Sequence, residues 1–145
     1  MKHMPQIIAF MTPFPYSVDI DAPLAEARAF MAKQHIRHLP VTDHGHLVGL
    51  VTDRDIKLML GPDFAYPQER ELKVRDASVA EPYIVAASAP VDEVATEMAD
   101  RHIGSALVTR DGKLVGVFTA TDACRALARV LRDRFPPPPL PESAA

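Results

Sequence analysis

The chain has 145 residues, of which 48% are hydrophobic and 24% are charged, a balance typical of a soluble globular domain with a real core. Its net charge of −3 disfavours nucleic acid and anionic membrane surfaces as partners, and no apolar run is long enough to predict a membrane span or a signal peptide. The single cysteine, Cys124, cannot form an internal disulfide, so we expect a cytoplasmic protein.

The first half of the chain predicts three strands and two helices. Pro23 suits the first turn of a helix, and Asp21 just before it is the expected N-terminal cap. Gly45 follows His44 between two apolar segments, which predicts a hairpin turn. In chain order the predicted elements are a strand at 16–20, a helix from Pro23, strands at 38–43 and 46–52, and a helix at 53–60.

The second half repeats this order. A shift of 67 residues pairs 15–60 with 82–127 without a gap, and 19 of the 46 pairs are identical. Unrelated segments would match at about one position in sixteen, so chance does not explain the similarity. Ser88 takes the place of Asp21 as the expected cap. The second set comprises a strand at 83–87, a helix from Pro90, strands at 105–110 and 113–119, and a helix at 120–132.

The repeats predict two structural units. We place the first unit at 7–60, a linker at 61–73, the second unit at 74–132, and a proline-rich tail, expected to be disordered, at 133–145. A unit of about 50 residues buries too little surface to be stable alone. We therefore expect a mixed α/β (α+β) fold in which two strand-helix-strand-strand-helix units pack sheet to sheet with pseudo-twofold symmetry.

One motif, Gly-x-x-Thr-x-x-Asp, occurs at 49–55 and again at 116–122. One interpretation is a capping box, in which the hydroxyl of Thr52 or Thr119 accepts from the backbone three residues later. The other is a ligand site. A helix N-terminus suits a phosphate, and Asp55 or Asp122 can accept hydrogen bonds from the two hydroxyls of a ribose. A base would then lie against apolar residues such as Ile36 or Ile103.

With these motifs the chain resembles the tandem CBS domain, or Bateman module. The resemblance covers roughly residues 7–132 and rests on "MTPFP", on "IRHLPV" followed by "HLVGLVTDRD", and on their second-copy equivalents. It implies a regulatory disc whose clefts bind AMP, ADP, ATP, S-adenosylmethionine or NAD(H). It also implies a homodimer of discs and a regulated partner protein.

The resemblance also implies the site residues, which we sort by repeat. Thr52 and Asp55 are the expected phosphate and ribose contacts of the first cleft, and Thr119 and Asp122 those of the second. The expected base contacts are Thr12, Tyr16, Ile36 and Arg37 in the first copy, and Tyr83, Ile103, Gly104 and Ser105 in the second. Since Arg37, His38, Arg54 and Lys57 all belong to the first copy, we expect more phosphate at the first cleft.

Three other classes of function are weighed against this one. Six histidines suggest a metal, but no Cys pair or His-Glu-x-x-His pattern accompanies them, so we expect no metal site and no catalytic cofactor. No nucleophile with an adjacent base is evident, so we expect no enzyme activity and no catalytic residue. The third class is a scaffold that shares the fold and serves oligomerisation or interaction without a ligand.

Overall fold

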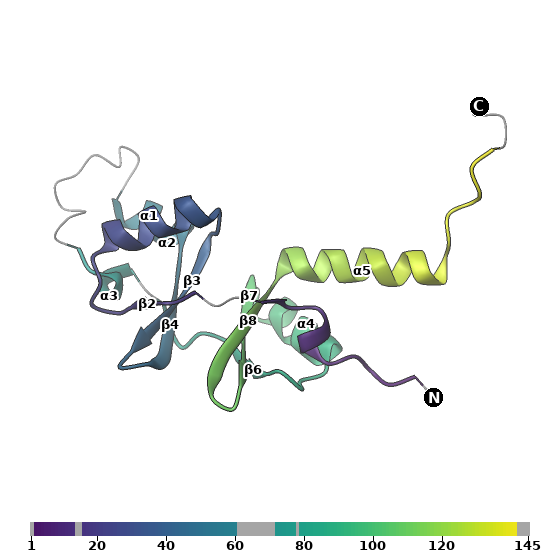
Figure 1. Cartoon of the computed structure of the whole chain (residues 1–145), viewed down its shortest axis with the longest axis horizontal. Helices are drawn as coiled ribbons and strands as arrows, with labels where there is room; N and C mark the ends of the chain where they lie inside the picture. The colour runs from purple at the N-terminus through teal and green to yellow at the C-terminus, as the bar shows by residue number, and fades with distance from the viewer. Residues whose placement is uncertain (1, 14–15, 61–71, 78, 142–145) are drawn as a thin grey trace.

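The computed structural model describes residues 2–13, 16–60, 72–77 and 79–141, and the whole chain is drawn in Figure 1. Its described part is a mixed α/β structure with two four-stranded sheets, as predicted. The first sheet has the order β2-β3-β4-β5 and the second the order β1-β8-β7-β6. Each sheet lies with its own helices at one end of the molecule, and the two sheets face each other at the centre (Figure 1).

The elements of the first sheet come almost entirely from the first repeat. β2 runs parallel to β3, which forms an antiparallel hairpin with β4, and β5 is antiparallel to β4. The bounds are β2 Val18–Asp19, β3 His38–Asp43, β4 His46–Thr52 and β5 Val79–Ala80, with helices α1 Leu24–Gln34, α2 Asp53–Leu60 and α3 Val74–Ala77.

The second sheet has the same plan. β6 runs parallel to β7, β7 forms an antiparallel hairpin with β8, and β1 is antiparallel to β8. The bounds are β1 Thr12–Pro13, β6 Ile84–Ala86, β7 Ser105–Arg110 and β8 Lys113–Thr119, with helices α4 Val91–Asp100 and α5 Ala120–Arg134 and a short 3-10 helix, η1, at Ile7–Ala9.

The leading strand of each repeat joins the sheet of the other repeat. β1 precedes the first repeat, yet Thr12 pairs with Val117 of β8. β5 precedes the second repeat, yet Ala80 pairs with Gly49 of β4. The two halves are therefore tied together by backbone hydrogen bonds at both ends as well as by packing. This exchange decides which residues meet in each cleft.

Both predicted hairpins are present, and their turns have the expected conformation. His44 and Gly45 have positive φ angles of 49° and 80°, and Asp111 and Gly112 have 53° and 77°. Two successive left-handed residues form the turn type that matches the twist of antiparallel strands. The tight turns therefore fix the pairing register of each hairpin, whose second strand leads into a Thr-x-x-Asp motif.

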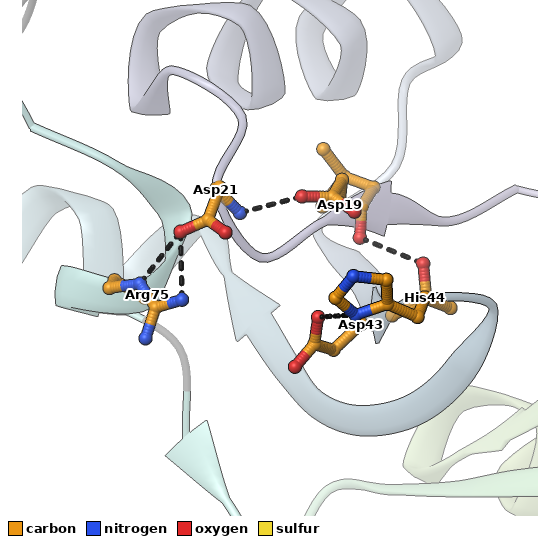
Figure 2. Close-up of polar contacts among 7 residues, drawn as sticks. Asp19, Asp21, Asp43, His44 and Arg75 are labelled. Atoms are coloured by element: carbon orange, nitrogen blue, oxygen red, sulfur yellow. Dashed lines mark hydrogen bonds and ion pairs between the residues drawn. The ribbon is translucent and has the colours of Figure 1, made fainter.

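The predicted caps at Asp21 and Ser88 are wrong. Pro23 and Pro90 occupy the N-cap positions of α1 and α4, and neither helix has a side-chain cap. The Asp21 carboxylate instead accepts from Nε of Arg75 and pairs with its Nη2, both at 2.8 Å (Figure 2). The ion pair lowers the pKa of Asp21, chiefly through the Arg75 hydrogen bond, and ties α3 to the loop before α1.

The described interior has two apolar clusters, the first of which takes residues from both sheets. The cluster around Leu24, Met31 and Ile56 of the first unit also includes Leu107 and Val117 of the second sheet. A second cluster lies around Val94, Val108 and Phe118. Because the first cluster takes side chains from both sheets, the two units form one body, as predicted from their small size.

The second helices of the two repeats differ in how exposed their matched residues are. Leu60 at the end of α2 is 4% exposed, whereas the repeat-matched Leu127 of α5 is 60% exposed. α5 is also longer and projects away from the sheets (Figure 1). It continues to Arg134, after which residues 136–141 are exposed and irregular. Within the described ranges, no helix combines the length and apolar character needed to cross a bilayer.

Candidate functional site

The first candidate site is a cleft between the two sheets, here named the Asp55 cleft. It has a volume of about 230 Å³. Thr52 ends β4 and Asp55 lies in the first turn of α2, and residues of the second repeat form the opposite wall. The described lining residues are His38, Leu50, Thr52, Asp55, Glu81, Pro82, Tyr83, Arg101, Ile103, Gly104 and Ser105.

The second candidate site, the Asp122 cleft, is the pseudosymmetric counterpart, with a volume of about 270 Å³. Thr119 ends β8 and caps α5, Asp122 lies in the first turn of α5, and the turn between α1 and β3 forms the opposite wall. The described lining residues are Thr12, His35, Ile36, Arg37, His38, Val117, Thr119, Thr121, Asp122 and Arg125.

The structure corrects the sorting of site residues by repeat. Ile103, Gly104 and Ser105 share a cleft with Asp55, not with Asp122. Ile36 and Thr12 share a cleft with Asp122 instead. The exchange of leading strands and the facing of the two sheets are the physical reasons, because both put the Thr-x-x-Asp corner of one repeat opposite the helix-to-strand turn of the other.

Both Thr-x-x-Asp motifs form reciprocal capping boxes. In the first, the Asp55 amide donates to Thr52 Oγ1 at 3.0 Å, and the Thr52 amide donates to Asp55 Oδ2 at 3.3 Å. In the second, the Asp122 amide donates to Thr119 Oγ1 at 3.3 Å, and the Thr119 amide donates to Asp122 Oδ2 at 2.9 Å. Each capping box therefore fixes its carboxylate at the N-terminus of a helix.

The two carboxylates differ in what else they bind. Asp122 is 7% exposed, and its Oδ1 accepts a hydrogen bond from Thr12 Oγ1 at 2.8 Å. Asp55 is half-buried, and among the described side chains and amides only the Thr52 amide donates to its carboxylate. The residue that the 67-residue shift matches to Thr12 is Val79, which has no hydroxyl.

His38 lies where the two clefts meet, because it lines both. Burial lowers the pKa of its imidazole, Asp55 opposes that shift, and Arg37 adds to it. The lowered pKa favours the neutral form of the imidazole. An anion bound in either cleft would favour the charged form.

The two predicted tyrosines have different surroundings. Tyr83 lines the Asp55 cleft, with the Arg101 guanidinium 5.2 Å from its ring centroid. Burial is the main cause that raises the pKa of the Tyr83 phenol. Tyr16 lines neither cleft: its ring packs edge-on against Phe30, and its hydroxyl donates to Gln34 Oε1 at 3.3 Å. Its expected role as a base contact has no geometric support here.

Basic residues gather outside the Asp55 cleft, beyond Thr52. A pocket of about 320 Å³, here named the outer pocket, is lined by Arg37, His38, Thr52, Asp53, Arg54 and Lys57. Arg54 thus lies beside Thr52 but outside the cleft proper. Arg37 also lines the Asp122 cleft, together with Arg125, so the expectation of more phosphate at the first cleft stays a prediction.

Several lining residues were not predicted. Leu50 and Val117 occupy matched positions in β4 and β8, and their shared place after the motif glycines was a usable signal. Glu81, which lines the Asp55 cleft, has a positive φ of 60°, and no sequence pattern predicted this conformation. As for metals, the described residues contain no group of three or more His, Cys, Asp or Glu side chains able to hold an ion.

Comparison with known proteins decides the family. The CBS domain model matches the chain twice, at residues 7–61 and 74–129. The chain belongs to the CBS domain family. The two matches and the two facing sheets make it a tandem CBS pair.

Three similar proteins illustrate this CBS pair's relatives. The uncharacterized protein YlbB of Bacillus subtilis (strain 168) is 35% identical over 99 residues, which cover 67% of this chain and 65% of YlbB. The CBS domain pair of protein MJ0100, solved in complex with 5'-methylthioadenosine and S-adenosyl-L-methionine, has a TM-score of 0.76 at 25% identity and covers 88% of this chain and 99% of that chain. CBSX2, solved in complex with AMP, has a TM-score of 0.72 at 25% identity and covers 86% and 97%.

Proposed function

We propose that this CBS pair is a regulatory module that binds an adenosine-containing nucleotide, namely AMP, ADP or ATP, and signals its occupancy to a partner protein. The observation that carries the proposal is the Asp55 carboxylate. The capping box holds it in the wall of the cleft, and it can still accept further hydrogen bonds. Two adjacent ribose hydroxyls are a suitable donor pair for such a carboxylate. The adenosine ligands in the MJ0100 and CBSX2 structures support this class, and S-adenosylmethionine is the second candidate.

The proposed roles follow the geometry of the Asp55 cleft. Asp55 binds the ribose, and Thr52 with Arg54 and His38 binds the phosphate. The base lies on the wall formed by Ile103 and Tyr83. In the Asp122 cleft, Asp122 and Thr119 take the ribose and phosphate, and Ile36 and Thr12 contact the base.

The signalling part of the proposal rests on exposed surface. Leu127, Val130 and Leu131 of α5 are 60%, 53% and 46% exposed and follow one another at helical spacing. We propose that this face joins two copies into a homodimer of discs, as the sequence resemblance implied. We further propose a cytoplasmic, non-enzymatic role in which ligand binding changes what the dimer presents to its partner.

A ligand-free scaffold is the second candidate, because one observation favours it. The Asp122 carboxylate already accepts from Thr12 and Thr119, so it has fewer acceptor sites left for a ligand than the Asp55 carboxylate has. In the scaffold hypothesis the Thr-x-x-Asp motif of the second repeat serves only as a helix cap. The Asp55 cleft does not share this feature, and it therefore separates the two candidates.

A thermal-shift screen tests the proposal. The chain is heated with AMP, ADP, ATP, S-adenosylmethionine or NADH, and a ligand at 100 times its dissociation constant stabilises by about 2.7 kcal/mol. Asp55→Ala removes the proposed ribose acceptor of the Asp55 cleft and is expected to reduce the shift to what the Asp122 cleft alone contributes. Arg110→Ala, in an exposed hairpin, is the control. No shift with any adenosine compound supports the scaffold instead.

A further inference from the structure

One described segment belongs to neither cleft and to neither apolar cluster. Residues 135–141 read Phe-Pro-Pro-Pro-Pro-Leu-Pro and follow Arg134, the last residue of α5. All seven residues are exposed, with Phe135 at 67% and Leu140 at 89%. The segment leads away from both sheets at the far end of α5, in yellow in Figure 1. It is here named the proline segment.

Ending α5 does not require this sequence. Phe135 already has non-helical angles, φ −125° and ψ 75°, and its amide donates to the Leu131 carbonyl at 2.7 Å. A single proline after that point would keep the helix from continuing, whereas the segment has five, at 136–139 and 141. The first repeat gives the comparison, because α2 ends at Leu60, the match of Leu127, and α5 continues beyond that shared length. The repeated fold therefore accounts for neither the extension nor the prolines.

Consecutive prolines favour one backbone conformation. Each ring holds φ at about −65° and keeps the residue before it extended. The result is a polyproline II helix, with roughly three residues per turn and a rise of about 3.1 Å per residue, so residues 136–141 would span about 19 Å. Residues three apart then lie along the same edge of the helix. That spacing places Phe135, Pro138 and Pro141 in one apolar row.

The backbone of the proline segment accepts hydrogen bonds but can barely donate them. All of residues 136–141 have a carbonyl oxygen, whereas only Leu140 has an amide hydrogen. A new sheet strand or a docked helix needs backbone donors, so neither is available to this segment. A partner must instead supply the donors, such as an indole N–H or a tyrosine hydroxyl, and flat apolar faces for the prolyl rings. Aromatic side chains provide both.

We propose that the proline segment is a docking peptide for a different protein, one whose groove is lined by aromatic side chains and recognises the polyproline II conformation. Phe135 and Leu140 add side-chain contacts near the two ends of the peptide. Because the prolines restrict the backbone before binding, little conformational entropy is lost when the segment docks. The inference goes beyond the proposed function and does not depend on a bound nucleotide.

The position of the segment suits a partner that binds without covering a ligand cleft. Asp122 lies in the first turn of α5, and the proline segment follows the last turn. At 1.5 Å per residue, the two ends of this helix lie about 20 Å apart. A domain docked on the segment therefore leaves the Asp122 cleft open.

Fluorescence titration of the full chain tests the proposal. The chain has no tryptophan, so the emission of a tryptophan in the groove of a probe protein reports binding without background. The probes are three isolated domains, one SH3, one WW and one EVH1 domain, each chosen with a tryptophan in its groove. The variants are Leu140→Ala and the tetra-alanine variant, Pro136→Ala/Pro137→Ala/Pro138→Ala/Pro139→Ala.

Leu58→Ala is the matched control. It makes the same chemical change as Leu140→Ala, at a leucine of α2 that is 74% exposed. Thermal unfolding of every variant checks that folding is intact. All the substituted side chains are exposed, so we expect parental stability in each variant.

We expect at least one of the three domains to bind the parent chain. The tetra-alanine variant should lose about tenfold or more in affinity, because the unbound backbone is no longer restricted. Leu140→Ala should lose about threefold to fivefold through its missing side-chain contact. Leu58→Ala should bind as the parent does.

The inference is overturned if none of the three domains binds the parent, or if the tetra-alanine variant binds as tightly as the parent. Equal losses in Leu58→Ala and Leu140→Ala would place the contact on the body of the chain and would also overturn it. A tetra-alanine variant with an altered oligomeric state in sedimentation would show that a second copy covers the segment, contrary to docking on a different protein. AMP binding by a parent that binds none of the domains would leave the proposed function standing.

Discussion

The hydroxyl of Thr12 donates a hydrogen bond of 2.8 Å to Oδ1 of Asp122, although the two residues lie 110 positions apart in the chain. The contact exists because β1 leaves the first repeat and pairs with β8 of the second. It occupies one of the acceptor sites that a ribose would use in the Asp122 cleft. The two clefts of this pair are therefore unequal before any ligand arrives.

Replacing Thr12 with Val, the residue found at the matched position 79, removes this hydrogen bond. We expect the free energy of unfolding to fall by about 1 kcal/mol, because a buried carboxylate oxygen loses its partner. We also expect AMP to bind the Asp122 cleft about threefold to fivefold more tightly, since no hydroxyl competes with the ribose. Urea unfolding and calorimetry measure the two effects.

Thr12→Ser keeps the hydroxyl and is the matched control for this substitution. It should retain parental stability and affinity within error. Weaker AMP binding in Thr12→Val with parental binding in Thr12→Ser would show that the hydroxyl helps the ligand, contrary to the competition argued here.

A close approach of β1 to β8 requires glycine at residue 116. A Cβ there would lie 2.5 Å from the Met11 sulfur and 2.7 Å from the Thr12 carbonyl oxygen. We expect Gly116→Ala to lower the free energy of unfolding by about 1–3 kcal/mol through overpacking. Gly104→Ala is the control, because its Cβ would meet no atom within 4 Å. Equal stability of the two variants in urea would refute the proposed crowding.

The sequence predicted the features that depend on neighbouring residues and missed those that depend on residues far apart in the chain. The hairpins, the limits of α2 and both capping boxes followed from neighbouring residues, because turn and cap chemistry acts over a few positions. The exchanged strands β1 and β5 have two residues each, too few for a period, and their partners lie far along the chain. Without them, Ile36 and Ile103 were assigned to the wrong clefts.

The cap assignments failed for a related reason. Asp21 has the residue type and position of a helix cap, but Arg75 in α3 offers it a charged partner that lies 54 residues away. Sequence proximity could not reveal that competition. Figure 2 shows the neighbouring contacts, with the Asp21 amide donating to Asp19 and the His44 imidazole beside Asp43.

His38 should make stability depend on pH. Its pKa is lowered in the folded protein by burial and by Arg37, and Asp55 offsets part of that shift. The unfolded chain therefore binds more protons between the folded pKa and about 6.5, so the free energy of unfolding falls as pH falls through that window. Urea unfolding at several pH values, compared between the parent and His38→Gln, measures this contribution. A parental profile that stays parallel to that of His38→Gln would contradict it.

The exposed apolar face of α5 predicts a homodimer. Leu127→Glu places a charge on the face that we expect a second copy to cover, and it should shift the chain to monomer in sedimentation equilibrium. Leu140→Glu is the control, since Leu140 is 89% exposed in the irregular tail. A parent that sediments as a monomer at every concentration would remove α5 as the dimer surface.

The central claim is that each cleft is assembled from both repeats around one carboxylate. A crystal structure of the chain grown with AMP tests it most directly. We expect AMP in the Asp55 cleft, with its ribose hydroxyls on Asp55 of the first repeat and its base against Ile103 of the second. AMP bound wholly within one repeat, or an empty Asp55 cleft at saturating AMP, would contradict the account.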